Sequence, residues 1–286
     1  MTSPGPALPF LGLDTLWLQV TGTVCNIACR HCLVSAGPKV FKHRMMTVEQ
    51  CATALRTAEG HGLREVWFTG GEPFLHPEIL QIVDLALERA PLGILTNGML
   101  IHDDLAAALG RRFREAEYNL EIRVSLDGPT EQGNDRVRGK GVFARATEGI
   151  RNLARHGIEP IVAVTQLDDS ELSQAQFAAL LRGLGVERPR VKWIPPFRIG
   201  REDGRGRAYE TWESLTREDL AMPEVSWTLQ CGTGRTVTSE GVYPCPILIN
   251  EPGRKLADDL EGALVDHPVD HPACYTCFVE GFSCSS

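Results

Sequence analysis

Two features are missing from this chain of 286 residues: a long apolar run and a block of basic residues. No stretch approaches the ~18 consecutive apolar residues of a membrane-spanning helix, and the first residues lack the charged and apolar regions of a signal peptide. The net charge of −8 disfavours nucleic acid or an anionic membrane as the main partner. These absences predict a cytoplasmic protein that acts on a small or neutral molecule.

Nine cysteines stand out against this composition. A disulfide framework is disfavoured because the number is odd, the chain is long and no export signal is visible. Most of the cysteines fall into two groups, one near the start and one in the last quarter, and Cys51 stands alone between them as an expected core residue. This division predicts two metal sites on two structural units. The first group is Cys25, Cys29 and Cys32, and the second is Cys231, Cys245, Cys274, Cys277 and Cys284.

Short apolar, β-rich runs alternate with helical stretches over residues 16–193. This pattern is typical of strand-helix-strand units around a parallel sheet. Helices are expected over 141–156 and 170–184, a capping box at Thr47 and Gln50 starts another, and Pro77 is expected in the first turn of a fourth. The expected strands span residues 16–21, 65–69, 93–96, 121–126, 160–165 and 191–193.

The composition changes after the last expected strand. Residues 195–207 are rich in Pro, Gly and Arg and lack periodicity, which is typical of a connector or lid. The remainder of the chain, from about residue 208, has short strand-like pieces and many turn residues. It is too short to bury much apolar surface, so bound metal is expected to stabilise it.

The first cysteine group has the spacing C-x-x-x-C-x-x-C and follows the first expected strand. A closed structural site for zinc or an iron-sulfur cluster normally has four protein ligands, so three ligands leave one coordination position open, as in a catalytic site. The loops that follow the strands hold the chemistry in parallel α/β folds. Thiolates favour zinc and iron-sulfur clusters over hard cations.

The loop after the second strand contains Gly70-Gly71-Glu72-Pro73, and together with the cysteine triplet it resembles the radical S-adenosylmethionine (radical SAM) enzymes. The resemblance implies an α/β fold with a partial (β/α)6, TIM-like barrel over residues 14–200, after an N-terminal tail over 1–13. It implies a four-iron four-sulfur cluster on the three cysteines, with the methionine part of SAM on the open iron. One-electron reduction then cleaves SAM to a 5'-deoxyadenosyl radical, which abstracts a substrate hydrogen.

Further motifs follow the next strands: LTNG at 95–98, SLDG at 125–128 and NDRVRG at 134–139. The last resembles the family's H-D-x-x-R-G, although Asn134 replaces the common histidine and one extra residue separates Ser125 from Arg138. Arg138 would bind the cofactor carboxylate, and a surface ion pair is the alternative. The residues implied to bind the cofactor are His31, Gly70, Gly71, Glu72, Pro73, Thr96, Asn97, Ser125, Asp127 and Arg138.

Some of these side chains also have purely structural interpretations. Glu72 is implied to accept hydrogen bonds from the cofactor ammonium, but it could instead cap the following helix. Thr96 and Asn97 could simply cap a turn. His31 takes the aromatic position beside the adenine, and packing within the loop is the alternative.

The second cysteine group resembles the auxiliary-cluster extensions called SPASM and Twitch. Only three residues separate Gly241 from Cys245, and five cysteines cannot saturate two clusters. The resemblance therefore implies a small iron-sulfur domain of the short Twitch form over residues 201–286, with one auxiliary cluster. A structural zinc ribbon is the alternative. The expected ligands are Cys231, Cys245, Cys274 and Cys277, with Cys284 as a replacement or a spare.

Three functions are compatible with these motifs. The first is an oxidoreductase that oxidises (dehydrogenates) or epimerises a small polar metabolite such as an aminosugar or polyol. The second is modification of a ribosomally made peptide, by a thioether or carbon crosslink or by decarboxylation. The third is a non-catalytic iron-sulfur or zinc protein, which the intact motifs disfavour. Because only 24 residues precede Cys25, a leader-recognition domain before the core is not expected, and the first function is favoured.

The partners follow from this interpretation. A small-molecule substrate and a flavodoxin- or ferredoxin-type electron donor are expected, and a peptide substrate stays open. Arg198 and Arg201 lie in the connector and are candidates to contact an anionic or hydroxyl-rich substrate through their planar guanidinium groups. Solvated loop arginines are the alternative, and no acid or base residue can be chosen.

Overall fold

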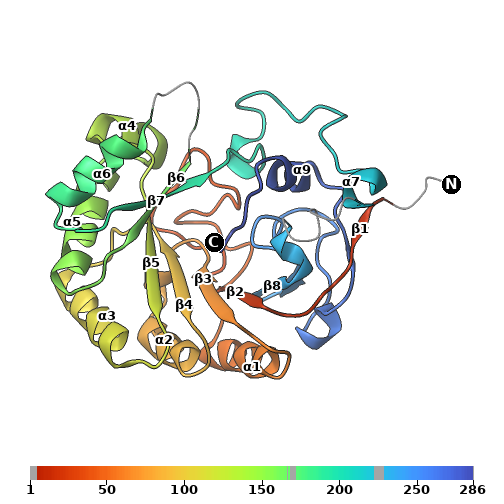
Figure 1. The fold of residues 1–286 in the computed structure, drawn as a ribbon, viewed down its shortest axis with the longest axis horizontal. Helices are drawn as coiled ribbons and strands as arrows, with labels where there is room; N and C mark the ends of the chain where they lie inside the picture. Colours follow the sequence, from red (N-terminus) through yellow and green to blue (C-terminus); the bar gives the residue numbers. More distant parts are fainter. Residues whose placement is uncertain (1–4, 166, 168–171, 222–228, 286) are drawn as a thin grey trace.

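The computed structural model describes residues 5–165, 167, 172–221 and 229–285. Within them, one sheet has eight strands in the order β7-β6-β5-β4-β3-β2-β8-β9. Strands β2 to β7 run parallel, and a helical connection joins each to the next (Figure 1). This arrangement confirms the α/β class and the partial (β/α)6 barrel.

The six parallel strands lie within two residues of the expected positions. They are β2 (Thr15–Gln19), β3 (Glu65–Thr69), β4 (Leu92–Thr96), β5 (Leu120–Ser125), β6 (Ile161–Thr165) and β7 (Arg190–Ile194). The connecting helices are α1 (Val48–Glu59), α2 (Ile79–Leu87), α3 (Asp103–Glu115), α4 (Glu131–Arg138), α5 (Val142–Arg155) and α6 (Gln174–Gly183). The sequence analysis did not predict α3 and α4.

The starts of two helices differ in how well the sequence predicted them. The capping box before α1 is confirmed, because Thr47 and Gln50 each accept a hydrogen bond from the other's backbone N–H. The expected start at Pro77 is wrong, since α2 begins after Glu78. The ring of His76 accepts the N–H of Glu78 at 3.1 Å, which fixes a turn there before the helix begins. Ser170, the expected start of α6, lies outside the described residues.

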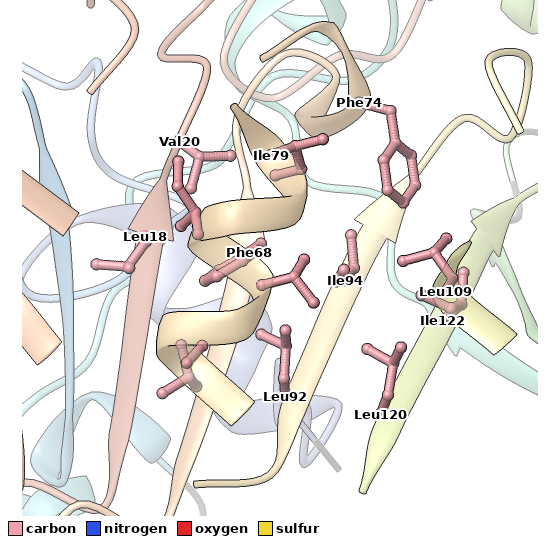
Figure 2. Close-up of a cluster of buried hydrophobic side chains, with 14 of the residues drawn as sticks. Leu18, Val20, Phe68, Phe74, Ile79, Leu92, Ile94, Leu109, Leu120 and Ile122 are labelled. Carbon is pink, nitrogen blue, oxygen red and sulfur yellow. The ribbon is translucent and has the colours of Figure 1, made fainter. Parts of the chain in front are cut away.

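The barrel core lies between the strands and the outer helices. Leu18, Phe68, Ile94 and Ile122 occupy one register line across β2, β3, β4 and β5, and all four are fully buried beneath α2 and its neighbours (Figure 2). Side chains alternate between the two faces of a strand. The neighbours of these residues in sequence therefore point into the barrel, which makes the inner wall.

The C-terminal part of the chain extends the barrel sheet. Strand β8 (Gly234–Thr238) pairs in parallel with β2, and β9 (Gly241–Tyr243) pairs with β8 in an antiparallel hairpin. Farther out, β1 (Ala7–Leu8) pairs with β10 (His267–Pro268). Among the described residues, the helices of this part are α7 (Arg217–Ala221) and α9 (Pro272–Val279). The 3-10 turns described along the chain are η1 (Pro73–Leu75), η2 (Gly200–Glu202), η3 (Gln230–Gly232) and η4 (Glu261–Ala263).

This part has more buried apolar surface than the sequence predicted. Val242 and Leu260 belong to the barrel core, and a second core includes Leu229 and Val269 together with Phe197 of the connector. The reason is that β8 continues the barrel sheet instead of forming a separate one. Among the helices of the described residues, none is long and apolar enough to cross a membrane.

Candidate active site

A cavity of about 240 Å³ lies at the carboxyl ends of the parallel strands. The last residue of each strand from β2 to β7 lines it, because the strands of such a barrel end at one rim. All three cysteines of the first group line it as well. The strand-end residues are Gln19, Thr69, Thr96, Ser125, Thr165 and Ile194.

Each sulfur of the first cysteine group accepts a hydrogen bond from an N–H group. The donors are the Asn97 amide to Cys25 at 3.8 Å, the Arg138 guanidinium to Cys29 at 3.9 Å and the Ala36 backbone to Cys32 at 3.2 Å. Such donors stabilise a thiolate more than a thiol. The arrangement fits cysteines that hold a metal cluster as thiolates, since hydrogen bonds to sulfur are part of such sites.

Burial makes these thiols poor acids when no cation is bound. It raises the pKa of Cys25 to about 12, and burial also raises the pKa of Cys29 against the lowering effect of the Arg138 charge. In the described residues, no group of three or more His, Cys, Asp or Glu side chains is arranged to hold a metal ion. A four-iron cluster is wider than one ion, so its cysteines stand farther apart. Three soft sulfur donors around one cavity therefore fit an iron-sulfur cluster.

The two glycines after β3 let the second loop pack against the cysteine loop. A Cβ atom on Gly71 would lie 1.9 Å from the carbonyl oxygen of Val24. The next residue, Glu72, donates its backbone N–H to that same carbonyl at 3.0 Å. Gly70 has a φ of 142°, a conformation that favours glycine. The glycine pair is thus required by the close approach of two loops.

Glu72 is completely buried behind the cavity wall, and neither it nor Pro73 lines the cavity. Its carboxylate accepts hydrogen bonds from the Thr96 hydroxyl and the Asn97 N–H, both at 2.7 Å, and from the Phe74 N–H at 3.1 Å. Burial raises the pKa of Glu72 to about 7, although these hydrogen bonds act to lower it. The structure gives Glu72 the role of joining the ends of β3 and β4. Contact with the cofactor ammonium stays a prediction.

Thr96 and Asn97 do more than cap a turn. Both line the cavity, and the Asn97 amide donates to the Asn26 side chain at 2.7 Å. This bond ties the end of β4 to the cysteine loop. The strand end, the glycine loop and the cysteine loop therefore form one connected wall.

A buried ion-pair network supports another part of the cavity wall. Oδ2 of Asp127 lies 2.9 Å from Nε2 of His31 and 2.7 Å from Nε of Arg138. Burial acts to raise the pKa of Asp127, but the charges of Arg138 and His31 hold it below its usual value. Arg138 and His31 line the cavity, whereas Asp127 lies behind them. The surface ion pair considered for Arg138 is wrong, because this side chain is buried.

Asn134 explains how the chain tolerates its departure from the family motif. Its side-chain oxygen accepts the Asp127 N–H at 3.0 Å, and its amide donates to Asp135 at 3.1 Å. Asn134 is fully buried beside Asp127, the aspartate of this network. The asparagine thus fixes the loop that carries Asp127.

The two connector arginines do not line the cavity. Arg198 forms an ion pair with Glu213 at 2.6 Å and stacks on the Tyr209 ring at 3.9 Å. Arg201 donates to the carbonyls of Cys29 at 3.1 Å and Ser35 at 2.9 Å. Neither position supports the predicted substrate contact. Arg201 instead holds the cysteine loop in place.

Sequence reasoning missed the charged residues inside the barrel. Arg123 and Lys192 line the cavity from the middle of β5 and β7, and no Asp or Glu is among the described lining residues. Burial lowers the pKa of Lys192 to about 8, assisted by the nearby Arg123 charge. Arg123 donates to the Cys284 carbonyl at 3.1 Å, and Lys192 donates to that of Ser283 at 2.7 Å. A basic residue in the middle of each strand, between apolar neighbours, was the available signal.

A second, smaller cavity of about 40 Å³ is lined by all five cysteines of the second group. None of the nine cysteines is in a disulfide. Burial raises the pKa of Cys274 and Cys284 to about 12 and that of Cys231 and Cys277 well above the usual value. Five converging sulfur atoms fit an iron-sulfur cluster or zinc.

The two cavities share part of their walls. Cys284 is the one described cysteine that lines both of them, and Trp17 of β2 lines both as well. The shared residues form a boundary between two adjoining cavities, each lined by one cysteine group. The shared lining residues are Trp17, Pro246, Ile247, Phe282 and Cys284.

Comparison with known proteins agrees with this site. The sequence profile of the Radical SAM superfamily matches residues 20–171, more than half of the chain. The chain therefore belongs to the radical SAM superfamily, whose enzymes use SAM and a four-iron four-sulfur cluster.

Individual relatives and solved structures are similar to most of this chain. The mycofactocin maturase MftC of Mycobacterium tuberculosis is 31% identical over 254 residues, which cover 85% of this chain and 60% of MftC. Streptococcus suis SuiB, solved with its precursor peptide SuiA, superposes with a TM-score of 0.67 at 15% identity, over 93% of this chain and 66% of SuiB. The enzyme anSMEcpe with bound AdoMet gives a TM-score of 0.65 at 14% identity, over 94% of this chain and 84% of that one. The chain spans between 45% and 60% of the length of the mycofactocin maturases that it matches.

Proposed function

We propose that this radical SAM enzyme modifies a peptide, by forming a thioether or carbon crosslink or by decarboxylation. The relatives support a peptide over a small metabolite: SuiB was solved with a precursor peptide, anSMEcpe with a peptide, and AlbA of Bacillus subtilis serves the biosynthesis of the bacteriocin subtilosin. Oxidation of an aminosugar or polyol was favoured from the short stretch before Cys25.

The single observation that carries the proposal is one cavity whose wall holds the three cysteines of the first group, the glycine loop and the strand ends. Cys25, Cys29 and Cys32 would hold the four-iron cluster. When bound there, the cluster and SAM supply one-electron cleavage and a hydrogen-abstracting radical. The largely apolar lining of the cavity would limit the access of water to that radical.

Other residues of the wall would orient the cofactor. Arg138, held by Asp127, presents its guanidinium to a carboxylate, and guanidinium-carboxylate bonds are comparatively strong. His31 is held by the same aspartate and would lie beside the adenine. Gly70, Gly71, Thr96, Asn97 and Ser125 would contact the remaining polar groups.

We assign an auxiliary iron-sulfur cluster to the second cysteine group. Cys231, Cys245, Cys274 and Cys277 are the proposed ligands, and Cys284 faces both cavities as a fifth thiol. Four thiolates complete such a cluster, which suits it to electron transfer. A flavodoxin- or ferredoxin-type protein in the cytoplasm is the proposed electron donor. The boundaries of the barrel at residues 14 and 200 stay a prediction.

Two measurements test the proposal. Protein reconstituted anaerobically with iron and sulfide is expected to bind close to two four-iron clusters, and Cys29→Ala to bind close to one. Cys51→Ala is the matched control, because Cys51 is a buried residue of α1 and should leave both clusters intact. One cluster with stoichiometric zinc in the unmodified chain would contradict the auxiliary assignment.

The substrate class is tested with SAM, dithionite and two panels, one of synthetic peptides and one of aminosugars and polyols. The proposal expects 5'-deoxyadenosine to form faster with a peptide than without substrate, and deuterium from a labelled peptide to enter it. Cys29→Ala should show neither effect. Stimulation and deuterium transfer confined to the sugars and polyols would contradict the peptide and restore the oxidation hypothesis.

A further inference from the structure

Arg235 is a completely buried cation in β8, next to the second cysteine group. Its guanidinium donates hydrogen bonds to four backbone carbonyl groups and lies 4.4 Å from the centre of the Phe10 ring. The hydrogen-bond needs of the side chain are therefore met within the protein. The carbonyl acceptors are Ala263 at 2.7 Å, Cys231 at 2.8 Å, Gly234 at 2.6 Å and Val265 at 2.6 Å.

Its charge, in contrast, has no carboxylate partner. Among the described residues, Arg235 forms hydrogen bonds to carbonyls alone and no ion pair, whereas nearby Arg254 pairs with Asp270 at 2.6 Å. A buried charge is costly unless an opposite charge balances it. The groups whose negative charge acts on Arg235 are, in order of effect, the thiolates of Cys231 and Cys245 and the carboxylate of Asp266.

The arrangement explains why the cation is there. Iron-sulfur clusters with four thiolate ligands carry net negative charge, and their reduction adds one more electron. Nearby charge, hydrogen bonds and burial set their reduction potential. A fixed cation behind Cys231 favours the reduced state, because it stabilises the more negative form.

We propose that Arg235 is a positioning and charge-balancing residue of the auxiliary cluster, and that its positive charge raises the reduction potential of that cluster. The inference rests on the cluster assignment made under the proposed function. It adds a residue outside the ligand set that tunes the auxiliary cluster.

The test isolates the auxiliary cluster. The full chain carries Cys25→Ala, Cys29→Ala and Cys32→Ala, so that iron and sulfide supplied under anaerobic conditions enter the second site alone. The midpoint potential is then measured by redox titration followed by electron paramagnetic resonance. Arg235→Gln removes the charge and keeps an amide donor, while Arg235→Lys keeps the charge and loses the guanidinium geometry.

Arg235→Gln is expected to lower the ratio of reduced to oxidised cluster at a fixed potential at least tenfold, which is about 59 mV for a one-electron couple. Arg235→Lys should stay close to the parent. Arg112→Gln is the control, since Arg112 of α3 is paired with Asp84 of α2 at 2.6 Å on the outside of the barrel and its loss should leave the potential within a few-fold. A purely structural role of Arg235 would change cluster retention without this charge-dependent order.

The outcomes separate the two proposals. If the triple-alanine chain takes up no iron, the auxiliary cluster is wrong and the role of Arg235 falls with it. If it takes up iron and Arg235→Gln keeps the parental potential, the role of Arg235 is overturned while the cluster stands. If Arg235→Gln loses the cluster, a Lys variant that retains it at the parental potential supports the proposal, and a Lys variant that also loses it overturns the proposal.

Discussion

At the scale of single residues, Glu72 shows how a motif carboxylate can act from behind a binding wall. Its two oxygens accept three hydrogen bonds from the ends of two loops, and no part of it is exposed. Removing such an acceptor leaves buried donors unpaired, which costs about 1–3 kcal/mol for each group. The geometry of the wall therefore depends on this side chain whether or not it touches the cofactor.

Glu72 should give the cluster-free protein a distinctive pH dependence of stability. Burial raises its pKa in the folded state to about 7, above the ordinary value of 4.5, so the folded state binds a proton that the unfolded state releases. The contribution is fully present below pH 4.5 and is lost as the pH rises through 7. Urea unfolding should show the free energy of unfolding falling by about 3 kcal/mol over this range, relative to Glu72→Gln. Parallel pH curves for the two proteins would contradict this.

Gly71 should be intolerant of even one added carbon. A Cβ atom in Gly71→Ala would overlap the Val24 carbonyl at 1.9 Å, so the two loops must separate. We expect the free energy of unfolding to fall by about 3 kcal/mol, because such strain cannot relax locally. SAM cleavage should be lost as well. Gly183→Ala is the control, since nothing lies within 4 Å of the added atom and alanine favours the helix. Equal stability of the two variants would show that the loop contact is not tight.

At the scale of elements, the connector acts on the cysteine loop. Arg201 joins the 3-10 turn η2 to the carbonyls of Cys29 and Ser35, and its own backbone N–H donates to Cys32 at 3.1 Å. The connector has the composition of a flexible lid, but it fixes the cysteine loop in position. Its position across the loop is set by Phe197 and Ile199, which are buried in the second core.

Arg201→Met should weaken the first site and leave the second intact. The variant loses the guanidinium bonds to the cysteine loop, so we expect iron content after reconstitution to fall toward that of Cys29→Ala. Arg198→Met is the control, because Arg198 binds Glu213 and Tyr209 away from the loop and should retain both clusters. Full iron content in Arg201→Met, or an equal loss of iron in Arg201→Met and Arg198→Met, would show that the Arg201 bonds are not needed to hold the cluster.

Sequence alone predicted the elements that depend on local patterns. The six barrel strands are short apolar runs, and the cysteine, glycine and arginine motifs lie in the loops after them. Helix α4 was missed because Val137 is its one apolar side chain, whereas α3 contains the apolar run 105–109, a helical signal that was not used. The pairing of β8 with β2 joins residues more than two hundred positions apart, and no local pattern reports it.

The site was predicted in the same uneven way. The spacing of Cys25, Cys29 and Cys32 predicted one shared site, and all three line one cavity. The sequence could not show that Glu72 lies behind the wall of that cavity. Nor could it find Arg123, because whether a strand residue faces the barrel or the helices depends on a register that only the fold fixes. Charged residues in apolar strands are the part of the pattern that merits more weight.

At the scale of the whole molecule, the barrel and the C-terminal part share one sheet, and the C-terminal hairpin packs into the barrel core. β8 is hydrogen-bonded to β2, and Val237 and Val242 belong to the same hydrophobic cluster as the barrel strands. The two cysteine groups are therefore held on one continuous scaffold. A fixed separation between the two cysteine groups follows from this construction.

The shared core predicts a single cooperative unfolding transition for the cluster-free protein. Val242→Ala removes two buried methyl groups from the C-terminal hairpin and should cost about 2 kcal/mol. Because the core is shared, the far-ultraviolet circular dichroism of the barrel helices should shift to lower urea together with the fluorescence of Trp17 and Trp67 in the barrel wall. Val279→Ala is the control, since Val279 is exposed at the end of α9 and should change neither signal. A barrel signal that keeps its midpoint in Val242→Ala would mean that the two parts unfold separately, and the sheet would then join them without coupling them.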